Sequence, residues 1–312
     1  MHWLIWVLIG FVLSGIPVTF ILSWIIYATL LRRKKSDKWG RGPSMPTDEE
    51  YMRLYAQAEE WRKEHLSAKK DVETVNDKLR LAGEYFDFGA DRAVIIIPGR
   101  MESCIYSCHY AEPYRAAGWN VLTVDGRAHG LSEGHVSSVG QKEYRDILAW
   151  ARFLHDECNI KDIVLHGICI GSSTAIFAAT DSACPDYIRG IVSDGVYQRF
   201  YDSFRNHMTE ANRPLFPFLY QSMLYVRLAS GVDVVHDGPM YRIDRLTKPV
   251  LFLHSREDTF STPDKAQELF EKCASEQKTM HWFEHGNHSR LRVLNREEYD
   301  GAVLEYISGI AD

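Results

Sequence analysis

Apolar and polar positions follow different periods in different parts of this 312-residue chain. Residues 1–31 contain no Asp, Glu, Lys or Arg and are rich in Trp, Leu, Ile, Val and Phe. From residue 71 onward, short apolar runs alternate with segments of helical period, and residues 93–97 form one continuous apolar run. Such a run is typical of a strand that is buried on both faces. Regular strand and helix alternation predicts a mostly parallel sheet covered by helices on both faces.

The same pattern predicts individual elements. An antiparallel pair is expected at the sheet edge, and an amphipathic helix is expected to open at the capping-box pair Thr47 and Glu50. The predicted strands are 72–81, 84–88, 93–97, 121–124, 163–165, 188–192, 250–253 and 279–283, and the predicted helices after residue 71 are 105–117, 143–156, 172–179, 263–274 and 296–307. We divide the chain into an anchor (1–31), a basic and Pro/Gly linker (32–46), the amphipathic helix (47–70), a first core part (71–195), an aromatic insertion (196–248) and a second core part (249–312).

The first 31 residues are long enough to cross a bilayer, which takes about 20 apolar residues as a helix. The run Arg32-Arg33-Lys34-Lys35 follows at once. Because basic residues stay on the cytoplasmic side, we expect a single-pass membrane protein with its N-terminus outside and its main domain in the cytoplasm. A cleaved signal peptide is the alternative, but it would have a basic start and a shorter apolar run.

Charge and cysteine content narrow the function classes. The net charge of −6 gives no reason to expect a nucleic-acid partner. The six cysteines show no C-x-x-C pair and no zinc spacing, which fits free thiols in a reducing compartment. We expect no cofactor, and the oligomeric state stays open.

The segment Gly167-Ile168-Cys169-Ile170-Gly171 joins a predicted strand to a helix of small residues. Glycines on both sides allow a very tight turn, which would leave the Cys169 thiol exposed at its tip. There the unpaired N–H groups of the helix N-terminus would stabilise a thiolate and a developing oxyanion. A buried structural cysteine is the alternative interpretation of this motif alone.

Two further residues follow later strands. Asp258 and His288 each lie on the loop after a predicted strand, and ligands of parallel sheets bind beyond such strand ends. A nucleophilic thiol needs a base, and an imidazole needs a carboxylate that fixes its tautomer. Glu257 and His285 are the nearest competitors for these roles. A metal site that includes His281 is disfavoured because that residue lies within a strand.

Two loops carry a resemblance to a known family. Pro98-Gly99-Arg100-Met101-Glu102-Ser103 and Asp125-Gly126-Arg127-Ala128-His129-Gly130-Leu131-Ser132 resemble the monoacylglycerol lipase and lysophospholipase branch of the α/β-hydrolase superfamily, with Cys169 in place of the serine of its G-x-S-x-G turn. The resemblance implies an α/β-hydrolase fold, oxyanion donors at the N–H groups of Arg100 and Ile170 with Met101 as a substitute, and a cap formed by residues 196–248.

The resemblance also implies a Cys169, Asp258 and His288 triad that acts on a small acyl substrate, with lipid-like esters as candidates. Because a thiolate leaves more readily than an alkoxide, thioesters and activated esters suit a cysteine better than plain alkyl esters, whether the acyl group goes to water or to an acceptor. We expect the Arg100 and Glu102 side chains to form a structural pair, the alternative being that Arg100 binds a substrate carboxylate. The alternative to an enzyme is a catalytically silent, membrane-tethered binding or scaffold protein.

Overall fold

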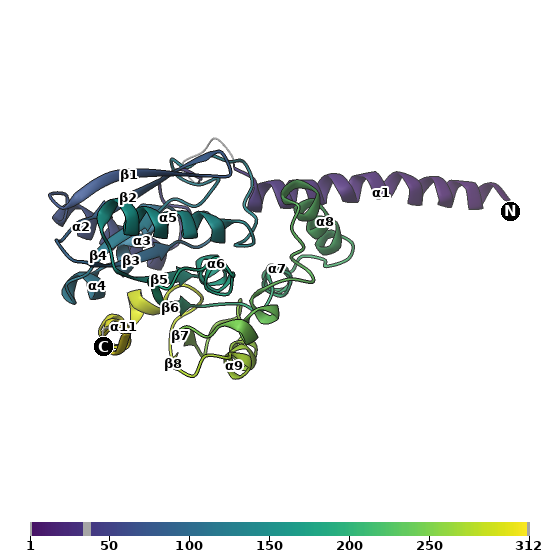
Figure 1. Ribbon diagram of the computed structural model, residues 1–312. Helices are drawn as coiled ribbons and strands as arrows, with labels where there is room; N and C mark the ends of the chain where they lie inside the picture. Colours follow the sequence, from purple (N-terminus) through teal and green to yellow (C-terminus); the bar gives the residue numbers. More distant parts are fainter. Residues whose placement is uncertain (1, 34–38, 311–312) are drawn as a thin grey trace.

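The computed structural model describes residues 2–33 and 39–310, apart from the side chains of residues 2, 4 and 7–14. Within these residues one eight-stranded sheet has the order β1-β2-β4-β3-β5-β6-β7-β8 (Figure 1). Its strands are β1 (Lys69–Asn76), β2 (Leu79–Phe86), β3 (Arg92–Ile97), β4 (Asn120–Val124), β5 (Asp162–Ile168), β6 (Ile188–Asp194), β7 (Val250–Ser255) and β8 (Lys278–Phe283). Strands β3 to β8 are parallel to one another, so the predicted mostly parallel sheet is confirmed.

The sheet edge differs from the prediction in its register. Strands β1 and β2 form the expected antiparallel pair, but they are joined by a two-residue turn at Asp77 and Lys78, whose φ angles are 51° and 64°. Two consecutive residues in the left-handed region match the twist of a tight hairpin. The predicted strand 72–81 is therefore wrong, because it runs through this turn.

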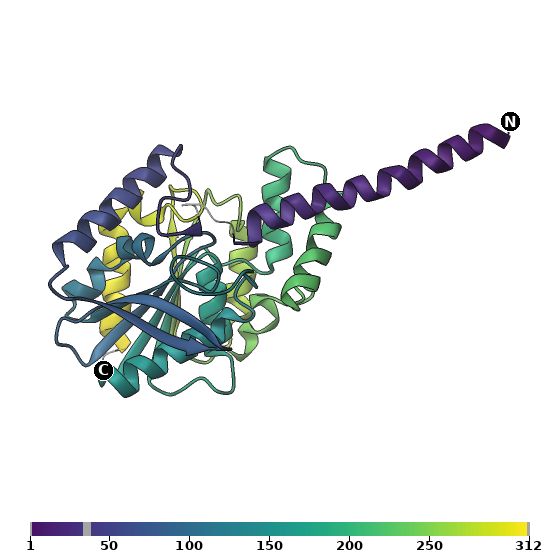
Figure 2. The ribbon, with the colours of Figure 1, turned by 90° about the horizontal axis from the view of Figure 1, so that it is seen from above.

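Helices cover both faces of the sheet (Figure 2). Side chains alternate along β3, so that Val94 and Ile96 face one helical layer while Ile95 and Ile97 face the other. The first layer contains α2 (Glu49–Glu64), α3 (Cys104–Ser107), α4 (Glu112–Ala116) and α11 (Arg296–Ile310), and the second contains α5 (Glu143–Cys158), α6 (Ile170–Ala179) and α9 (Pro263–Lys272). The predicted two-faced coverage is confirmed.

Two helix predictions need correction. The predicted helix 105–117 is broken into α3, a short 3-10 turn and α4, and Pro113 lies in the first turn of α4, where its missing N–H does no harm. Helix α2 is capped by Asp48 rather than Thr47, because the Asp48 carboxylate accepts the N–H of Tyr51 at 2.9 Å. It ends at Glu64, several residues before the predicted end, and the chain then enters β1.

Helix α1 (His2–Leu31) projects from the body of the molecule (Figure 1). Its second half packs beside α8 (Phe218–Ser230), where the Ser23 hydroxyl donates to Gln221 Oε1 at 2.8 Å and the Tyr225 hydroxyl donates to Phe20 O at 3.1 Å. Among the side chains that the structure describes, no helix supplies an apolar stretch long enough to cross a membrane. In the predicted linker, Trp39 is buried and its ring lies 5.0 Å from that of His129.

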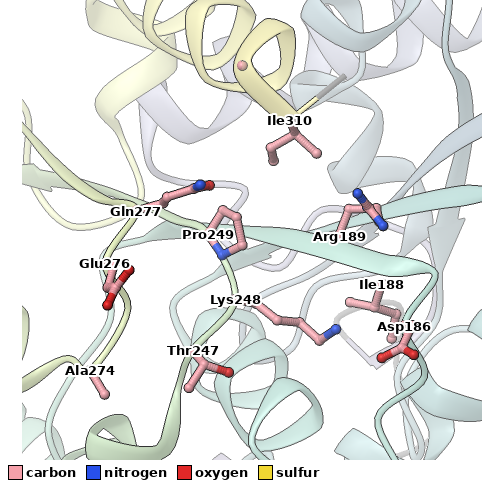
Figure 3. A pocket seen from close by; sticks show the side chains of 11 residues that line it. Asp186, Ile188, Arg189, Thr247, Lys248, Pro249, Ala274, Glu276, Gln277 and Ile310 are labelled. Carbon is pink, nitrogen blue, oxygen red and sulfur yellow. The ribbon is translucent and has the colours of Figure 1, made fainter. Parts of the chain in front are cut away.

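The insertion between β6 and β7 contains α7 (Phe200–Glu210), α8 and two short 3-10 turns. Its role as a cap stays a prediction. A wide pocket of about 820 Å³ lies at the amino ends of β6 and β7, where Arg189, Lys248 and Gln277 line it (Figure 3). Ligands of parallel sheets bind at the opposite, carboxyl ends of the strands, and the predicted site residues lie there.

Candidate active site

The turn at Cys169 has the geometry expected of a strained strand-to-helix junction, but Cys169, predicted to be exposed, is buried, with 8% of its surface accessible. Cys169 follows β5, precedes α6 and has φ 55° and ψ −111°, a conformation that costs free energy in a residue with a side chain. A Cβ on Gly167 would lie 2.3 Å from the backbone carbon of Gly171, and one on Gly171 would lie 2.1 Å from the carbonyl oxygen of Ile97. Both flanking positions therefore require glycine, and the turn holds the Cys169 side chain at the carboxyl end of the sheet.

Asp258 and His288 form a hydrogen-bonded pair on the loops after β7 and β8. The distance between His288 Nδ1 and Asp258 Oδ2 is 2.7 Å. The other oxygen of this carboxylate, Oδ1, accepts the N–H groups of Phe260 at 2.8 Å and Ser261 at 2.7 Å. Burial raises the pKa of Asp258, but the charge of His288 and these hydrogen bonds outweigh it and lower the pKa overall. Asp258 thus stays an anion whose orientation is fixed.

Cys169 lies beside the other ring nitrogen of His288. Both side chains line one cavity and interact electrostatically, and Nε2 is buried without a hydrogen-bond partner among the described residues. Burial lowers the pKa of His288, but the charges of Asp258 and Cys169 outweigh it and raise that pKa well above 6.5. This environment favours the protonated imidazolium form of His288, which places a positive charge beside the Cys169 side chain.

The competitors for these roles lie elsewhere. Glu257 and His285 are exposed and bind each other, with 3.2 Å between Oε1 and Nδ1. His281 lies in β8 and bonds to Glu298 at 2.9 Å. No group of His, Cys, Asp and Glu within the described part of the chain has the arrangement of a metal site.

The loop after β3 passes directly over the thiol. A Cβ on Gly99 would lie 3.7 Å from Cys169 Cβ, so the backbone of this loop packs closely beside the Cys169 side chain. The N–H of Met101 donates to His129 Nε2 at 3.1 Å and is therefore occupied. The N–H groups of Arg100 and Ile170 have no acceptor among the described residues. These two N–H groups remain available to bind an oxyanion, whereas the N–H of Met101, the predicted substitute, is not available.

The loop side chains contradict one prediction. Glu102 accepts hydrogen bonds from the Ser44 and Tyr51 hydroxyls, the second at 2.8 Å, and forms no ion pair with Arg100. The guanidinium of Arg100 instead donates to the carbonyl oxygen of Leu30 at 3.4 Å. The expected structural pair is wrong because residues 100 and 102 turn toward different neighbours.

The cavity over Cys169 has a volume of about 240 Å³. Its walls combine apolar, cationic and acidic side chains. They come from the segment before α2, the loop after β3, α3, the insertion and the loops after β7 and β8: Met45, Arg100, Glu102, Tyr106, Tyr197, Phe200, His207, Phe260 and Arg290. A mostly apolar cavity with a few convergent polar groups is typical of a small-molecule site.

A buried polar network behind His288 escaped sequence reasoning. Asp194, at the end of β6, accepts the Tyr299 hydroxyl at 2.8 Å, and Tyr299 in turn contacts His166 Nε2 at 3.0 Å. Burial raises the pKa of Asp194 to about 7. The next residue, Gly195, lies against the His288 ring, since a Cβ there would be 3.2 Å from Cε1. The sequence signal for it is a carboxylate at the end of the strand next to β5.

Comparisons with known proteins agree with this geometry. Residues 92–231 match the family described as alpha/beta hydrolase fold, and residues 231–292 match the family described as serine aminopeptidase, S33. The chain has the α/β-hydrolase fold. An esterase from Pyrococcus furiosus, Pf2001, is 26% identical over 80% of the hydrolase and 93% of that chain, with a TM-score of 0.66. Together these matches make the protein a hydrolase that acts on ester bonds.

Two further matches show how much of the chain resembles known proteins. The uncharacterized protein YqkD of Bacillus subtilis is 28% identical over 221 residues, which cover 70% of the hydrolase and 72% of YqkD. An alpha-beta hydrolase from Vibrio vulnificus covers 88% of the hydrolase and 99% of its own chain, with 17% identity and a TM-score of 0.59. At that identity the second match shows the fold alone.

Proposed function

We propose that the hydrolase cleaves esters or thioesters through a covalent acyl thioester on Cys169. The proposal rests on one observation: the buried Asp258 and His288 pair faces the thiol at the tip of the tight turn after β5. Asp258 orients His288, and His288 acts as general acid and then as general base. The N–H groups of Arg100 and Ile170 bind the oxyanion.

In the first step the Cys169 thiolate attacks the acyl carbon and forms a C–S bond, while the carbonyl electrons move onto oxygen. The resulting oxyanion accepts hydrogen bonds from the N–H groups of Arg100 and Ile170. Collapse of this adduct breaks the bond to the leaving alcohol or thiol, which takes the proton from His288 Nε2. The acyl group is then held on Cys169 as a thioester.

In the second step His288 removes a proton from water, which attacks the thioester carbon. The C–S bond breaks, and the acid and the Cys169 thiolate are released. An acceptor hydroxyl or amine in place of water would give acyl transfer by the same sequence of bonds. Both outcomes use the same three side chains.

The substrate class follows from the nucleophile. In an adduct formed from an alkyl ester, the Cys169 sulfur is a better leaving group than the alkoxide, so the adduct reverts to substrate. With a thioester or an activated ester the adduct can go forward, because the substrate's leaving group departs as readily as the Cys169 sulfur. Lipid-like acyl compounds are proposed on the resemblance of the two loops to lipases.

Mass spectrometry of the intact protein tests the intermediate. Mixing with a short-chain thioester should give one acyl adduct, located on Cys169, and Cys169→Ala should abolish both adduct and turnover. Cys158→Ala, at a half-buried cysteine far along α5, serves as the matched control and should behave as wild type. Turnover that persists in Cys169→Ala would contradict the proposal, as would equal kcat/KM for a thioester and its alkyl ester analogue.

We also propose that residues 1–31 hold the hydrolase at a membrane. Support comes from the lack of charged side chains in this run and from the basic residues Arg32 to Lys35 that follow it. Expression of the full chain and of a chain that begins at residue 39, followed by fractionation, tests this. Recovery of both forms in the supernatant, with no detergent needed, would contradict the anchor.

A further inference from the structure

Arg100 has an unusual position among the charged residues of the cavity. It lies on the turn after β3, next to Gly99, and lines the same cavity as Cys169 and His288. A negative charge on Cys169 raises the pKa of Arg100, so the two side chains are within electrostatic reach of each other. Any group attached to a substrate acyl carbon at Cys169 is therefore within the electrostatic reach of this guanidinium.

No carboxylate of the described residues lies within ion-pair distance of Arg100. The nearest acid, Glu102, lines the same cavity and its charge acts on Arg100, but its carboxylate bonds to Ser44 and Tyr51 and forms no ion pair with the guanidinium. The second arginine of the cavity, Arg290, shows the contrast, because it pairs with Asp48 at 3.0 Å. Among the described residues, Arg290 thus has a carboxylate within ion-pair distance and Arg100 has none.

Among the described residues, the Arg100 side chain makes one hydrogen bond, which leaves most of its N–H donors without an acceptor. A guanidinium carries five N–H groups, and here one of them reaches Leu30 O at 3.4 Å, beyond the usual 2.7 to 3.2 Å. This contact places a cation near the C-terminus of α1, where the helix dipole favours it. That structural role uses one donor and leaves the others for a ligand.

Partial burial of this cation has a cost that an anion would offset. Burial lowers the pKa of Arg100, so its charged form is destabilised while it lacks a partner. Planar carboxylates and phosphates match the guanidinium fork and bind it through two parallel hydrogen bonds.

His207 supplies a second donor on the same side. It extends from α7 into the cavity, and its ring lies 5.8 Å from that of Phe260. Burial, together with the charge of Arg100, lowers the pKa of His207, so its imidazole is neutral at pH 7. A neutral imidazole can donate one N–H to an oxyanion.

We propose that Arg100, assisted by His207, binds an anionic group of the substrate, a carboxylate or a phosphate, next to the acyl carbon held at Cys169. The inference rests on the proposed cysteine mechanism and names its substrate class: an acyl ester or thioester that carries a negative charge. Apolar walls from Phe200 and Phe260 accommodate the rest of the molecule.

Alkylation of Cys169 tests the subsite without any knowledge of the natural substrate. Iodoacetate and iodoacetamide attach nearly the same group, but only the first carries a carboxylate. The ratio of their rate constants at Cys169, measured by peptide mass spectrometry, should fall about tenfold in Arg100→Gln, as expected for loss of a hydrogen-bonded charge pair. Arg100→Lys should retain part of the ratio.

The matched control is Arg205→Gln, which removes the same charge from an exposed position on α7 and should keep the wild-type ratio. An equal ratio in wild type and Arg100→Gln, with Cys169 still reactive toward iodoacetamide, would overturn the subsite and leave the cysteine mechanism standing. Failure of both reagents to modify Cys169 in the wild-type protein would overturn both. Circular dichroism melting checks that each variant folds, and Arg100→Lys carries the test if Arg100→Gln does not.

Two pairs of substrates distinguish a carboxylate from a phosphate as the anionic group that Arg100 binds. The first pair is a thioester whose acyl chain ends in a carboxylate and the same thioester as its methyl ester. The second is a monoacyl glycerol with and without a phosphate on the glycerol. The charged-to-neutral ratio of kcat/KM should fall in Arg100→Gln for one pair, which identifies the group, and no fall in either pair would overturn the proposal.

Discussion

Asp258 Oδ2 lies 2.7 Å from His288 Nδ1, and this contact leaves Nε2 of the same ring facing Cys169. The carboxylate accepts a hydrogen bond from the Nδ1–H group, so it fixes the ring with Nε2 turned toward the cavity. The neighbouring acid Glu257 is turned outward and binds His285 instead. Two adjacent carboxylates therefore have different consequences for activity.

We predict that Asp258→Asn lowers kcat by about 10³-fold or more, because an amide can donate to Nδ1 and stabilise the wrong tautomer. Glu257→Gln is the matched control, since it makes the same chemical change one residue away and should leave kcat near the wild-type value. Steady-state hydrolysis of a thioester measures both. A large loss in Glu257→Gln together with an active Asp258→Asn would reverse the assignment.

The tight turn at Cys169 makes a prediction about stability. Gly171→Ala would place a Cβ 2.1 Å from the carbonyl oxygen of Ile97, in rigid backbone that cannot move aside. We expect it to destabilise the fold by about 3 kcal/mol or more, or to prevent soluble expression. Gly301→Ala in α11 is the control, because nothing lies within 4 Å of its new methyl group. It should stabilise the helix by up to about 1 kcal/mol and so raise Tm slightly. Equal Tm values for the two variants would contradict the close packing of the turn.

Local patterns were sufficient to predict the parts of the site that lie at strand ends. Cys169, Asp258 and His288 could be located because each follows a short apolar run, and parallel strands bring such ends to one edge of the sheet. The roles of these residues remain predictions. The hairpin turn at Asp77 and Lys78 was missed because neither residue is a glycine, although both adopt positive φ.

Contacts between distant segments could not be read from the sequence. Glu102 bonds to Tyr51, which is 51 residues away on α2, and nothing in the local pattern of either segment indicates this. The Tyr299 and Asp194 contact spans 105 residues. Such pairs depend on how whole elements pack, and they decide which cation of the cavity stays unpaired.

The Tyr299 and Asp194 contact predicts a pH-dependent loss of stability. Burial raises the pKa of Asp194 to about 7, while the Tyr299 hydroxyl lowers it by stabilising the anion. Tyr299→Phe removes that donor, so it should cost about 1 kcal/mol at pH 5.5, where the carboxyl is protonated, and about 2 to 3 kcal/mol at pH 8, where it is ionised. Urea denaturation at both pH values measures the difference.

Tyr306→Phe is the control for this experiment. The Tyr306 hydroxyl donates to the carbonyl oxygen of Pro249 at 2.8 Å, a neutral acceptor, so its loss should cost the same at both pH values. A Tyr299→Phe effect that is equally independent of pH would show that Asp194 does not ionise in this range.

Glu102 gives the last prediction, which concerns the connection between the loop after β3 and helix α2. Burial raises the pKa of Glu102 to about 7, although hydrogen bonds from Ser44 and Tyr51 act in the opposite direction. An unfolded glutamate has a pKa near 4.3, so the folded state holds its proton more tightly. The stability from this group is complete below pH of about 4 and is lost as the pH rises to about 7. In Glu102→Gln, which cannot ionise, the free energy of unfolding should therefore decrease less between pH 5 and pH 8 than in wild type, by up to about 3 kcal/mol. The exposed acid Glu60 on α2 provides the control Glu60→Gln, whose pH profile should follow wild type.

Parallel profiles for wild type and Glu102→Gln, measured by urea denaturation, would mean that Glu102 is ionised throughout, held as an anion by its two hydroxyl donors.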